Sequence, residues 1–225
     1  MKQNTIRAGM AAAIPVAIGY VPLGLACGIV GAKAGLSLLQ VALLSVFLYA
    51  GSGQFMIASM FAAGASPISI GVSVALVNMR HILYGSALVQ YFHQESKWFT
   101  TLFAAEITDE SFGVNIGRFQ KGNWNPRSAR AVNTTSHATW TLSNCLGVIV
   151  GTMIPLDTAI IGFSMTSIFI CLLMMQKSTQ DHLWAMGVAA FGVVGAKLLG
   201  LSQVAILIGA LMGVAAGVIA GRKGR

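Results

Sequence analysis

Three charged side chains stand at the centres of two apolar segments, where a charge needs a partner or water. Arg80 lies at the middle of the segment 67–92, and Asp109 and Glu110 lie at the middle of the segment 98–118. If these segments cross a membrane, an unpaired charge at its centre costs at least about 2.5 to 3.5 kcal/mol on insertion scales. We therefore expect the arginine and the acids to face the protein interior and to lie near each other.

This set of charges suits a small anion or zwitterion. A guanidinium binds a carboxylate, and Tyr84 stands one helical turn from Arg80, so its hydroxyl can reach the same anion. Asp109 and Glu110 supply two acids against one arginine, which leaves one acid to carry a proton or to meet a cation. A purely structural ion pair that locks two helices is the alternative interpretation.

A second feature at the same expected depth is the run Tyr49-Ala50-Gly51-Ser52-Gly53-Gln54 in the segment 38–63. Two glycines beside a serine weaken a helix, and open backbone inside a membrane is tolerated only against protein or a cavity. Broken helices of this kind aim amide and carbonyl groups at sites near the midplane of a membrane. Close helix packing at two small residues is an equally simple interpretation.

Two histidines add groups that titrate near neutral pH. His81 follows Arg80 directly but points about 100° away from it around a helix, and His137 lies in a polar run of the segment 131–154. A histidine inside a helical bundle is more often a hydrogen-bonded structural residue than a proton carrier. The candidates for a proton-exchanging group are His81, Asp109, Glu110 and His137.

The chain as a whole has the composition of a membrane protein. Of its 225 residues, 56% are hydrophobic and only 9% are charged, whereas about 25% of the residues of a soluble domain carry charge. A spanning helix needs about 20 apolar residues, so the length allows at most about eight to ten spans with short connections. We predict a single transmembrane domain over residues 1–225.

The apolar segments predict an all-α integral membrane protein, a polytopic helical bundle of about eight spans, with seven possible and with some helices broken near the midplane. If the segment 98–118 did not cross, the later clusters of lysine and arginine would face outward, against the bias that places them in the cytoplasm. Both termini and the polar loop near 119–130 are therefore predicted to be cytoplasmic, and a broken or re-entrant fourth segment would not change this. The segments are 8–32, 38–63, 67–92, 98–118, 131–154, 158–176, 183–199 and 204–221.

The net charge of +8 does not indicate a nucleic acid partner. The basic residues flank the apolar segments, and the bias toward cytoplasmic lysine and arginine explains their positions. Cys27, Cys145 and Cys171 lie singly in apolar runs, without a Cys-x-x-Cys pair. We expect no metal site and no cofactor.

Glycines four residues apart predict close contacts between helices, because small residues let two backbones approach each other in a membrane. We expect these faces to meet another helix of this chain or of a partner. They are formed by Gly24 and Gly28, by Gly147 and Gly151, and by Gly209, Gly213, Gly217 and Gly221.

Four runs in the first half of the chain share the residues and the order of a known family. They are IPVAIGYVPLG at 14–24, YAGSGQF at 49–55, NMRHILYG at 78–85 and TDESF at 108–112. In these runs the chain closely resembles the AzlC family of branched-chain amino acid permeases. The resemblance implies the large subunit of a two-component exporter, with many spans in the bacterial cytoplasmic (inner) membrane.

The resemblance also implies the substrates and the partner. The expected substrates are leucine, isoleucine and valine, with methionine as in some relatives, and the expected partner is a small AzlD-type membrane subunit of a few helices. Asn78 stands where some relatives carry an acid, which bears on the identity of the substrate. The candidate substrate-binding residues are Arg80, Tyr84, Asp109, Glu110, Tyr49, Gly51, Ser52, Gly53, Gln54 and Asn78.

We hypothesise that Arg80, Tyr84 and opened backbone at 51–54 hold the carboxylate of the amino acid, while Asp109 or Glu110 meets its ammonium group. Aromatic residues such as Phe55 and Phe112 would supply an apolar pocket for its side chain. The proton gradient or the membrane potential would drive export.

Two other classes of function stay open. One is a channel or a transporter for another small zwitterion or anion. The other is an intramembrane serine hydrolase that would use Ser52 with His81 or His137. We do not expect an enzyme, because the Gly-x-Ser-Gly signature of rhomboid-type proteases is absent.

Overall fold

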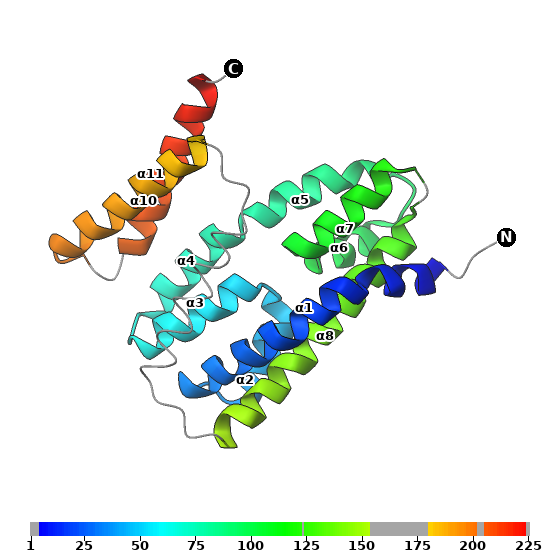
Figure 1. The fold of residues 1–225 in the computed structure, drawn as a ribbon, viewed down its shortest axis with the longest axis horizontal. Coiled ribbons are helices and arrows are strands. Elements are labelled where there is room, and N and C mark those ends of the chain that lie inside the picture. The colour runs from blue at the N-terminus through cyan, green and yellow to red at the C-terminus, as the bar shows by residue number, and fades with distance from the viewer. Residues whose placement is uncertain (1–4, 123, 154–179, 202–204, 224–225) are drawn as a thin grey trace. The chain divides into compact units, whose positions relative to one another are not determined.

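The computed structural model describes residues 5–122, 124–153, 180–201 and 205–223, and every regular element in that part of the chain is a helix (Figure 1). The predicted all-α class is therefore confirmed for the described residues. The elements are α1 (Thr5–Lys33), α2 (Leu38–Leu43), the π-helical η1 (Leu44–Leu48), α3 (Gly51–Ala62), α4 (Pro67–Asn78), α5 (Arg80–Leu88), the short 3-10 helix η2 (Val89–Tyr91), α6 (Lys97–Ala105), α7 (Asp109–Gln120), α8 (Pro126–Met153), α10 (Gln180–Leu198) and α11 (Ala205–Lys223).

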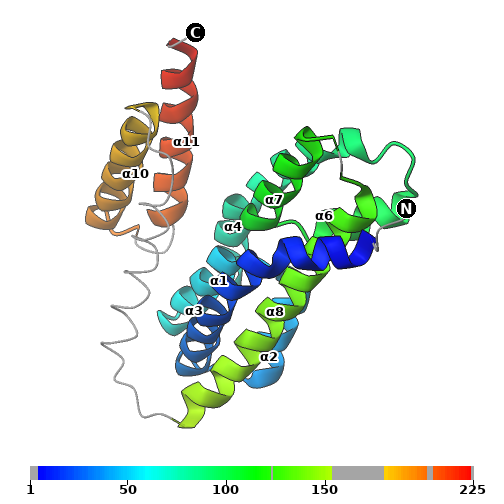
Figure 2. The same cartoon turned by 45° about the vertical axis from the view of Figure 1, so that its right-hand side comes forward.

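The chain divides into two compact units, which are described separately. Unit 1 contains Met1–Ser59 and Val77–Ile161, and unit 2 contains Met60–Leu76 and Gly162–Arg225. Within unit 1, α1 and α8 lie side by side, as the two views of Figures 1 and 2 show. A single domain over the whole chain stays a prediction.

Glycines allow α1 and α8 to pack backbone against backbone. A Cβ atom added at Gly24 would lie within 2.6 Å of a side chain of α8, and one at Gly151 would lie within 3.0 Å of the backbone of α1. A Cβ atom at Gly28 or Gly147 would overlap a carbonyl oxygen of the opposite helix. These predicted glycine contacts are thus confirmed as contacts within the chain.

In unit 2 the same principle joins α10 to α11. A Cβ atom at Gly192 would lie 3.1 Å from Cα of Gly209, and one at Gly213 would lie 2.8 Å from Cβ of Ala189. Gly217 faces α10 at a looser 3.4 Å. The glycine face of the last segment therefore contacts a helix of this chain. The surroundings of Gly221 are outside the described part of the structure.

The described helices follow the predicted segments. Helix α1 covers the first segment, and α8 covers the fifth and begins five residues earlier, at Pro126. Two helical stretches in the described part are long and apolar enough to cross a membrane, Thr5–Lys33 and Pro67–Tyr91. The segment 158–176 lies outside the described residues, so the count of spans and the side of the termini stay predictions.

Three predicted segments are interrupted. The segment 38–63 breaks at Tyr49 and Ala50, where Tyr49 adopts a left-handed conformation with φ of 40° and ends η1. The segment 67–92 is interrupted at Met79, and the segment 98–118 is interrupted over 106–108. One expectation needs correction: residues 51–54 are not open backbone, because α3 begins at Gly51 directly after the break.

Candidate functional site

The three interruptions bring together Arg80, Asp109 and Ser52 in unit 1. Arg80 is the first residue of α5, Asp109 is the first residue of α7, and Ser52 lies in the first turn of α3. Nη2 of Arg80 lies 2.9 Å from Oδ2 of Asp109 and donates to Oγ of Ser52 at 2.9 Å. The side chains of Arg80 and Asp109 keep 32% and 40% of their surface exposed, so a ligand can reach this ion pair.

Local sequence sets the position of the acids. Thr108 caps the start of α7, because its hydroxyl accepts from the backbone N–H of Ser111 while the Ser111 hydroxyl accepts from the backbone N–H of Thr108. Asp109 and Glu110 therefore lie in the first turn, at the end of the helix where the backbone dipole favours negative charge.

Tyr84 also contacts Asp109, and we call Ser52, Arg80, Asp109 and Tyr84 the first cluster. Its hydroxyl donates to Oδ1 of Asp109, and its ring stacks on Phe112 with 4.6 Å between the ring centroids. Asp109 thus receives a guanidinium on one carboxylate oxygen and a phenol on the other.

Glu110 has a different partner from Asp109. Oε2 of Glu110 accepts a hydrogen bond from the hydroxyl of Tyr20 at 2.6 Å, and the same hydroxyl lies 2.8 Å from Oγ1 of Thr108. Tyr20 is buried in α1, so this contact ties α1 to the start of α7. The second acid of the pair is therefore separate from Arg80 but is not without a partner.

His137 of α8 lies beside a third acid, Glu106. Nδ1 of His137 is 3.7 Å from Oε1 of Glu106, and Nε2 is 3.0 Å from the backbone oxygen of Ser45. The hydroxyl of Thr134 donates to the other carboxylate oxygen of Glu106 at 2.8 Å. The ring of Tyr49 stacks on the imidazole with 4.0 Å between centroids.

Gln54 and Gly51 have structural contacts in this arrangement. Nε2 of Gln54 donates to Oγ of Ser45 at 2.9 Å, and its Oε1 accepts from the indole N–H of Trp140 at 2.6 Å. A Cβ atom at Gly51 would lie 3.1 Å from the Trp140 ring, so glycine leaves space for that ring. These residues hold the broken segment against α8.

Three further candidates contact the clusters weakly or not at all. The ring of His81 lies 5.9 Å from the ring of Tyr84 in a tilted arrangement. Oδ1 of Asn78 is buried and has no hydrogen-bond partner in the part of the chain that the structure describes. Gly53 is buried within α3.

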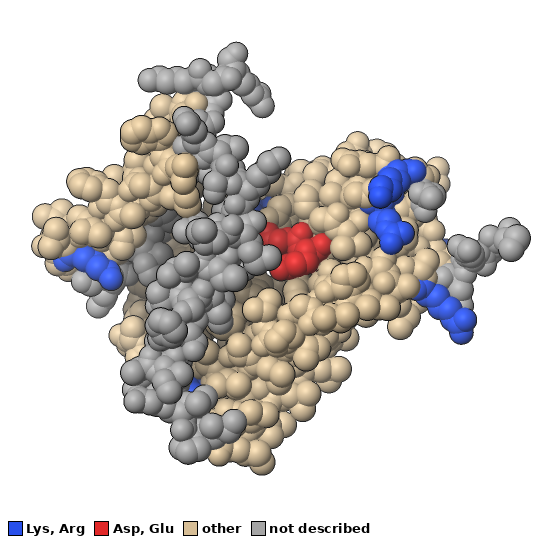
Figure 3. All heavy atoms as spheres, viewed as in Figure 1, with Lys and Arg blue, Asp and Glu red and all other residues tan. Residues whose placement is uncertain are grey.

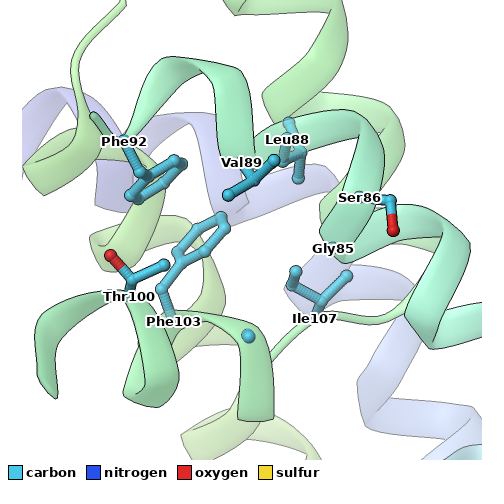
Figure 4. A pocket seen from close by; sticks show the side chains of 9 residues that line it. Gly85, Ser86, Leu88, Val89, Phe92, Thr100, Phe103 and Ile107 are labelled. Carbon is cyan, nitrogen blue, oxygen red and sulfur yellow. The ribbon is translucent and has the colours of Figure 1, made fainter. Parts of the chain in front are cut away.

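An apolar pocket of about 320 Å³ is lined by residues that neighbour the first cluster in the sequence (Figure 4). Gly85, which follows Tyr84, and Ile107, which lies between Glu106 and Thr108, both contribute to its wall. Phe92, directly after η2, and Phe103 of α6 point into it, as Figure 4 shows. Of the aromatic residues expected in an apolar pocket, Phe55 is buried elsewhere in α3, and Phe112 packs on Tyr84.

The charges around these clusters are mainly negative. In Figure 3 the acidic side chains gather in a single patch, and most of the lysines and arginines in that view lie away from it. Glu106, Asp109 and Glu110 occupy neighbouring positions at the α6–α7 interruption, and Arg80 pairs with only one of them. The region therefore suits a ligand that carries a positive group as well as a carboxylate.

The geometry gives no support to a serine hydrolase. Ser52 accepts a hydrogen bond from Arg80, and no hydrogen bond in the described part of the chain joins it to a histidine. His137 is instead directed at Glu106 and at the Ser45 carbonyl.

Tyr20 and Glu106 were missed as site residues by sequence reasoning. Tyr20 lies in the run 14–24 that carried the family resemblance, and that run was the available signal for it. Glu106 is the third acid of the fourth segment, and only the packing of α8 against the α6–α7 interruption reveals its partner.

Comparisons with known proteins identify a family. Residues 15–154 match the model of a family described as AzlC protein. The inner membrane protein YgaZ of Escherichia coli is 28% identical over 216 residues, which cover 93% of this chain and 88% of that protein. No solved structure matches the chain significantly.

Two further relatives broaden this result. A membrane protein of Archaeoglobus fulgidus is 26% identical over 94% of both chains. The branched-chain amino acid transport protein AzlC of Bacillus subtilis is 26% identical over 186 residues, which cover 80% of this chain and 73% of that protein. The family match therefore includes the contacts of Asp109, of Glu110 and of His137 described above.

Proposed function

This chain belongs to the AzlC family, and from this premise we propose that it is the large subunit of a two-component secondary transporter that exports branched-chain amino acids across the cytoplasmic membrane. Leucine, isoleucine and valine are the proposed substrates, with methionine as a further one. The observation that carries the proposal is the ion pair of Arg80 and Asp109, which lies where three interrupted helical segments meet.

The guanidinium of Arg80 is the proposed partner of the substrate carboxylate. Only its Nη2 takes part in the contacts with Asp109 and Ser52, and its Nε is buried without a hydrogen-bond partner among the described residues. A guanidinium carries five N–H donors, so donors remain for a carboxylate. Ser52, beside the guanidinium in the first turn of α3, is a further donor for the same group.

The carboxylate of Asp109 is the proposed partner of the substrate ammonium group. In the described state it is held by Arg80 and Tyr84. A zwitterion that enters between Arg80 and Asp109 replaces their ion pair with two new ones. Its carboxylate pairs with Arg80, and its ammonium group pairs with Asp109. Without substrate, Arg80 and Asp109 pair with each other. This pairing lowers the free-energy cost of placing two charges inside the membrane.

The pocket bounded by Gly85, Phe103 and Ile107 is the proposed site for the aliphatic side chain. Its walls are mainly apolar, with Ser86 and Thr100 as the polar exceptions. Its volume of about 320 Å³ lies at the lower end of the range typical of ligand pockets, as expected for a small amino acid. Two of its lining residues neighbour the proposed charge-binding residues in the sequence: Gly85 follows Tyr84, and Ile107 is two residues before Asp109.

Export and the small AzlD-type subunit are carried over from the family. The relative in Bacillus subtilis is named for branched-chain amino acid transport, and this name supports the substrate class. The proton gradient or the membrane potential would supply the energy.

The proposal is tested by efflux of labelled leucine and valine from preloaded membrane vesicles that contain this chain and the small subunit. We expect Arg80→Ala and Asp109→Asn each to reduce efflux by about tenfold or more, since each leaves a partner charge unpaired. Lys121→Gln is the matched control, because it removes one positive charge from the exposed linker after α7.

Variants must be compared at equal amounts of folded protein in the membrane. Normal efflux in both site variants would exclude this site. Flux that does not saturate with leucine concentration would instead indicate a channel.

A further inference from the structure

A second titratable pair lies apart from the Arg80–Asp109 pair and is more deeply enclosed. His137 and Glu106 keep 17% and 19% of their side-chain surface exposed, about half the exposure of the other pair. We propose that Glu106 and His137 together bind the proton that is exchanged for the amino acid. This inference rests on the proposed transport function and adds the site of energy coupling to it.

The hydrogen bonding of His137 leaves Nδ1 facing Glu106, where a proton can bind. A carbonyl oxygen can only accept, so Nε2 must donate its hydrogen to the backbone oxygen of Ser45, 3.0 Å away. Nδ1 then faces Oε1 of Glu106 at 3.7 Å. Without a further proton, the lone pair of Nδ1 would point at a carboxylate, which is repulsive. One proton on either atom turns this repulsion into attraction.

Two backbone groups of negative polarity lie beside the pair. Glu106 is the C-cap residue of α6, and the end of a helix at its C-terminus attracts cations and repels carboxylates. The Ser45 carbonyl adds a second negative dipole beside the imidazole. The described contacts of Glu106 and His137 include no lysine or arginine.

Tyr49 supplies a second polar group within this pair's surroundings. Its ring covers the imidazole face, and the left-handed backbone at the break holds it there. Its hydroxyl is buried near Tyr20, Thr108 and the carboxylates of Glu106 and Glu110, and Tyr49 as a whole is only 2% exposed.

The neighbouring titratable groups are already in use. Asp109 is paired with Arg80, and Glu110 accepts a hydrogen bond from Tyr20. The ring of His81 lies 5.9 Å from the ring of Tyr84, and its neighbouring charges are those of Arg80, Asp109 and Glu110. Among the described residues, Glu106 and His137 form a pair whose geometry suits one exchangeable proton.

In this proposal, the protein exchanges one proton for one amino acid. After the amino acid has left to the outside, a proton from the outside binds between Nδ1 and Oε1. It leaves to the cytoplasm before the next amino acid binds, so one proton enters for each amino acid exported. In the deprotonated state the two side chains repel each other across the contact between the α6–α7 interruption and α8.

The experiment compares two activities in inside-out vesicles that contain the full chain and the small subunit. The first is accumulation of labelled leucine driven by an acidic interior, and the second is leucine–leucine exchange without a gradient. We expect His137→Gln and Glu106→Gln to lose at least about tenfold of driven accumulation but to keep exchange within about twofold, because exchange needs no net proton movement. His93→Gln is the matched control at an exposed position and should keep both activities.

The outcomes separate the two proposals. Retained exchange shows that a variant is folded and binds leucine. Driven accumulation that survives in both Gln variants would overturn the proton site, and so would loss of exchange in both, since the pair would then belong to substrate binding. If the unaltered protein transports leucine in neither assay, the proposed function itself fails.

Discussion

Asp109, at the start of α7, accepts hydrogen bonds from two types of donor, both on α5. It accepts from the guanidinium of Arg80 and from the hydroxyl of Tyr84, and its position at the start of α7 is set by the Thr108 cap. Such a carboxylate keeps one orientation when substrate is absent. We therefore expect Tyr84 to act by orienting Asp109, and not through its ring alone.

Replacing Tyr84 by Phe tests this role at the scale of a single atom. The variant keeps the stack on Phe112 but loses the hydrogen bond to Asp109. A hydrogen bond to a charged group contributes about 1.5–3 kcal/mol, so the leucine concentration for half-maximal transport should rise by about tenfold or more. Tyr91→Phe, at a ring that stacks on Phe119, should leave this concentration unchanged.

The sequence predicted part of the site and could not predict the rest. The depth of Arg80 and Asp109 within their segments predicted that they would pair, because unpaired charge is costly there. Glu106 and His137 lie on elements far apart in the chain, and no periodicity relates them. Tyr20 is likewise joined to Glu110 only by the packing of α1 against α7.

At the scale of elements, α1 and α8 pack closely against each other within unit 1. Residues of α8 hold the broken segments in place: Trp140 binds Gln54, and His137 binds the Ser45 carbonyl. Displacing α8 from α1 would therefore disturb both clusters. The glycines between these helices determine how close they lie.

A methyl group at this contact should be costly. We expect Gly28→Ala to destabilise the protein by about 1–3 kcal/mol, because the new Cβ would overlap the backbone of Asn144 and the helices must separate. Thermal unfolding of the purified protein measures this. Gly19→Ala is the control on the same helix, since nothing lies within 4 Å of its added Cβ. Equal unfolding temperatures for the two variants would contradict the close contact.

Helix interruptions were only partly predictable. Glycines near residue 50 and the Thr108 cap with two acids after it are recognised signals, although the glycines follow the first break and belong to α3. The interruption at Met79 has no proline or glycine beside it. Met79 keeps right-handed helical backbone angles, so this interruption is slight and no local pattern marks it.

At the scale of the whole molecule, the central question is whether the interrupted α6–α7 segment crosses the membrane. If it crosses, the positively charged linker after α7 lies in the cytoplasm and Lys97, at the start of α6, lies outside. The three acids at the interruption would then lie between the two surfaces of the membrane, where solutes from either side can reach them.

Labelling of single cysteines with a membrane-impermeant maleimide tests this crossing. In a background without the native cysteines, Lys97→Cys should react in intact cells, and Lys121→Cys should react only after the membrane is opened. Both positions are exposed in the described structure. Reaction of both from the same side would show that the segment does not cross.

The double variant Arg80→Gln with Asp109→Asn tests most directly whether this ion pair binds the substrate. It replaces the ion pair with two neutral amides of similar size. If the pair binds the amino acid, the double variant should reach the membrane and unfold at nearly the temperature of the unaltered protein, yet show about tenfold or more reduction in leucine efflux. Leucine efflux at the unaltered rate in the folded double variant would contradict the account, because the charges would then serve only to join the helices.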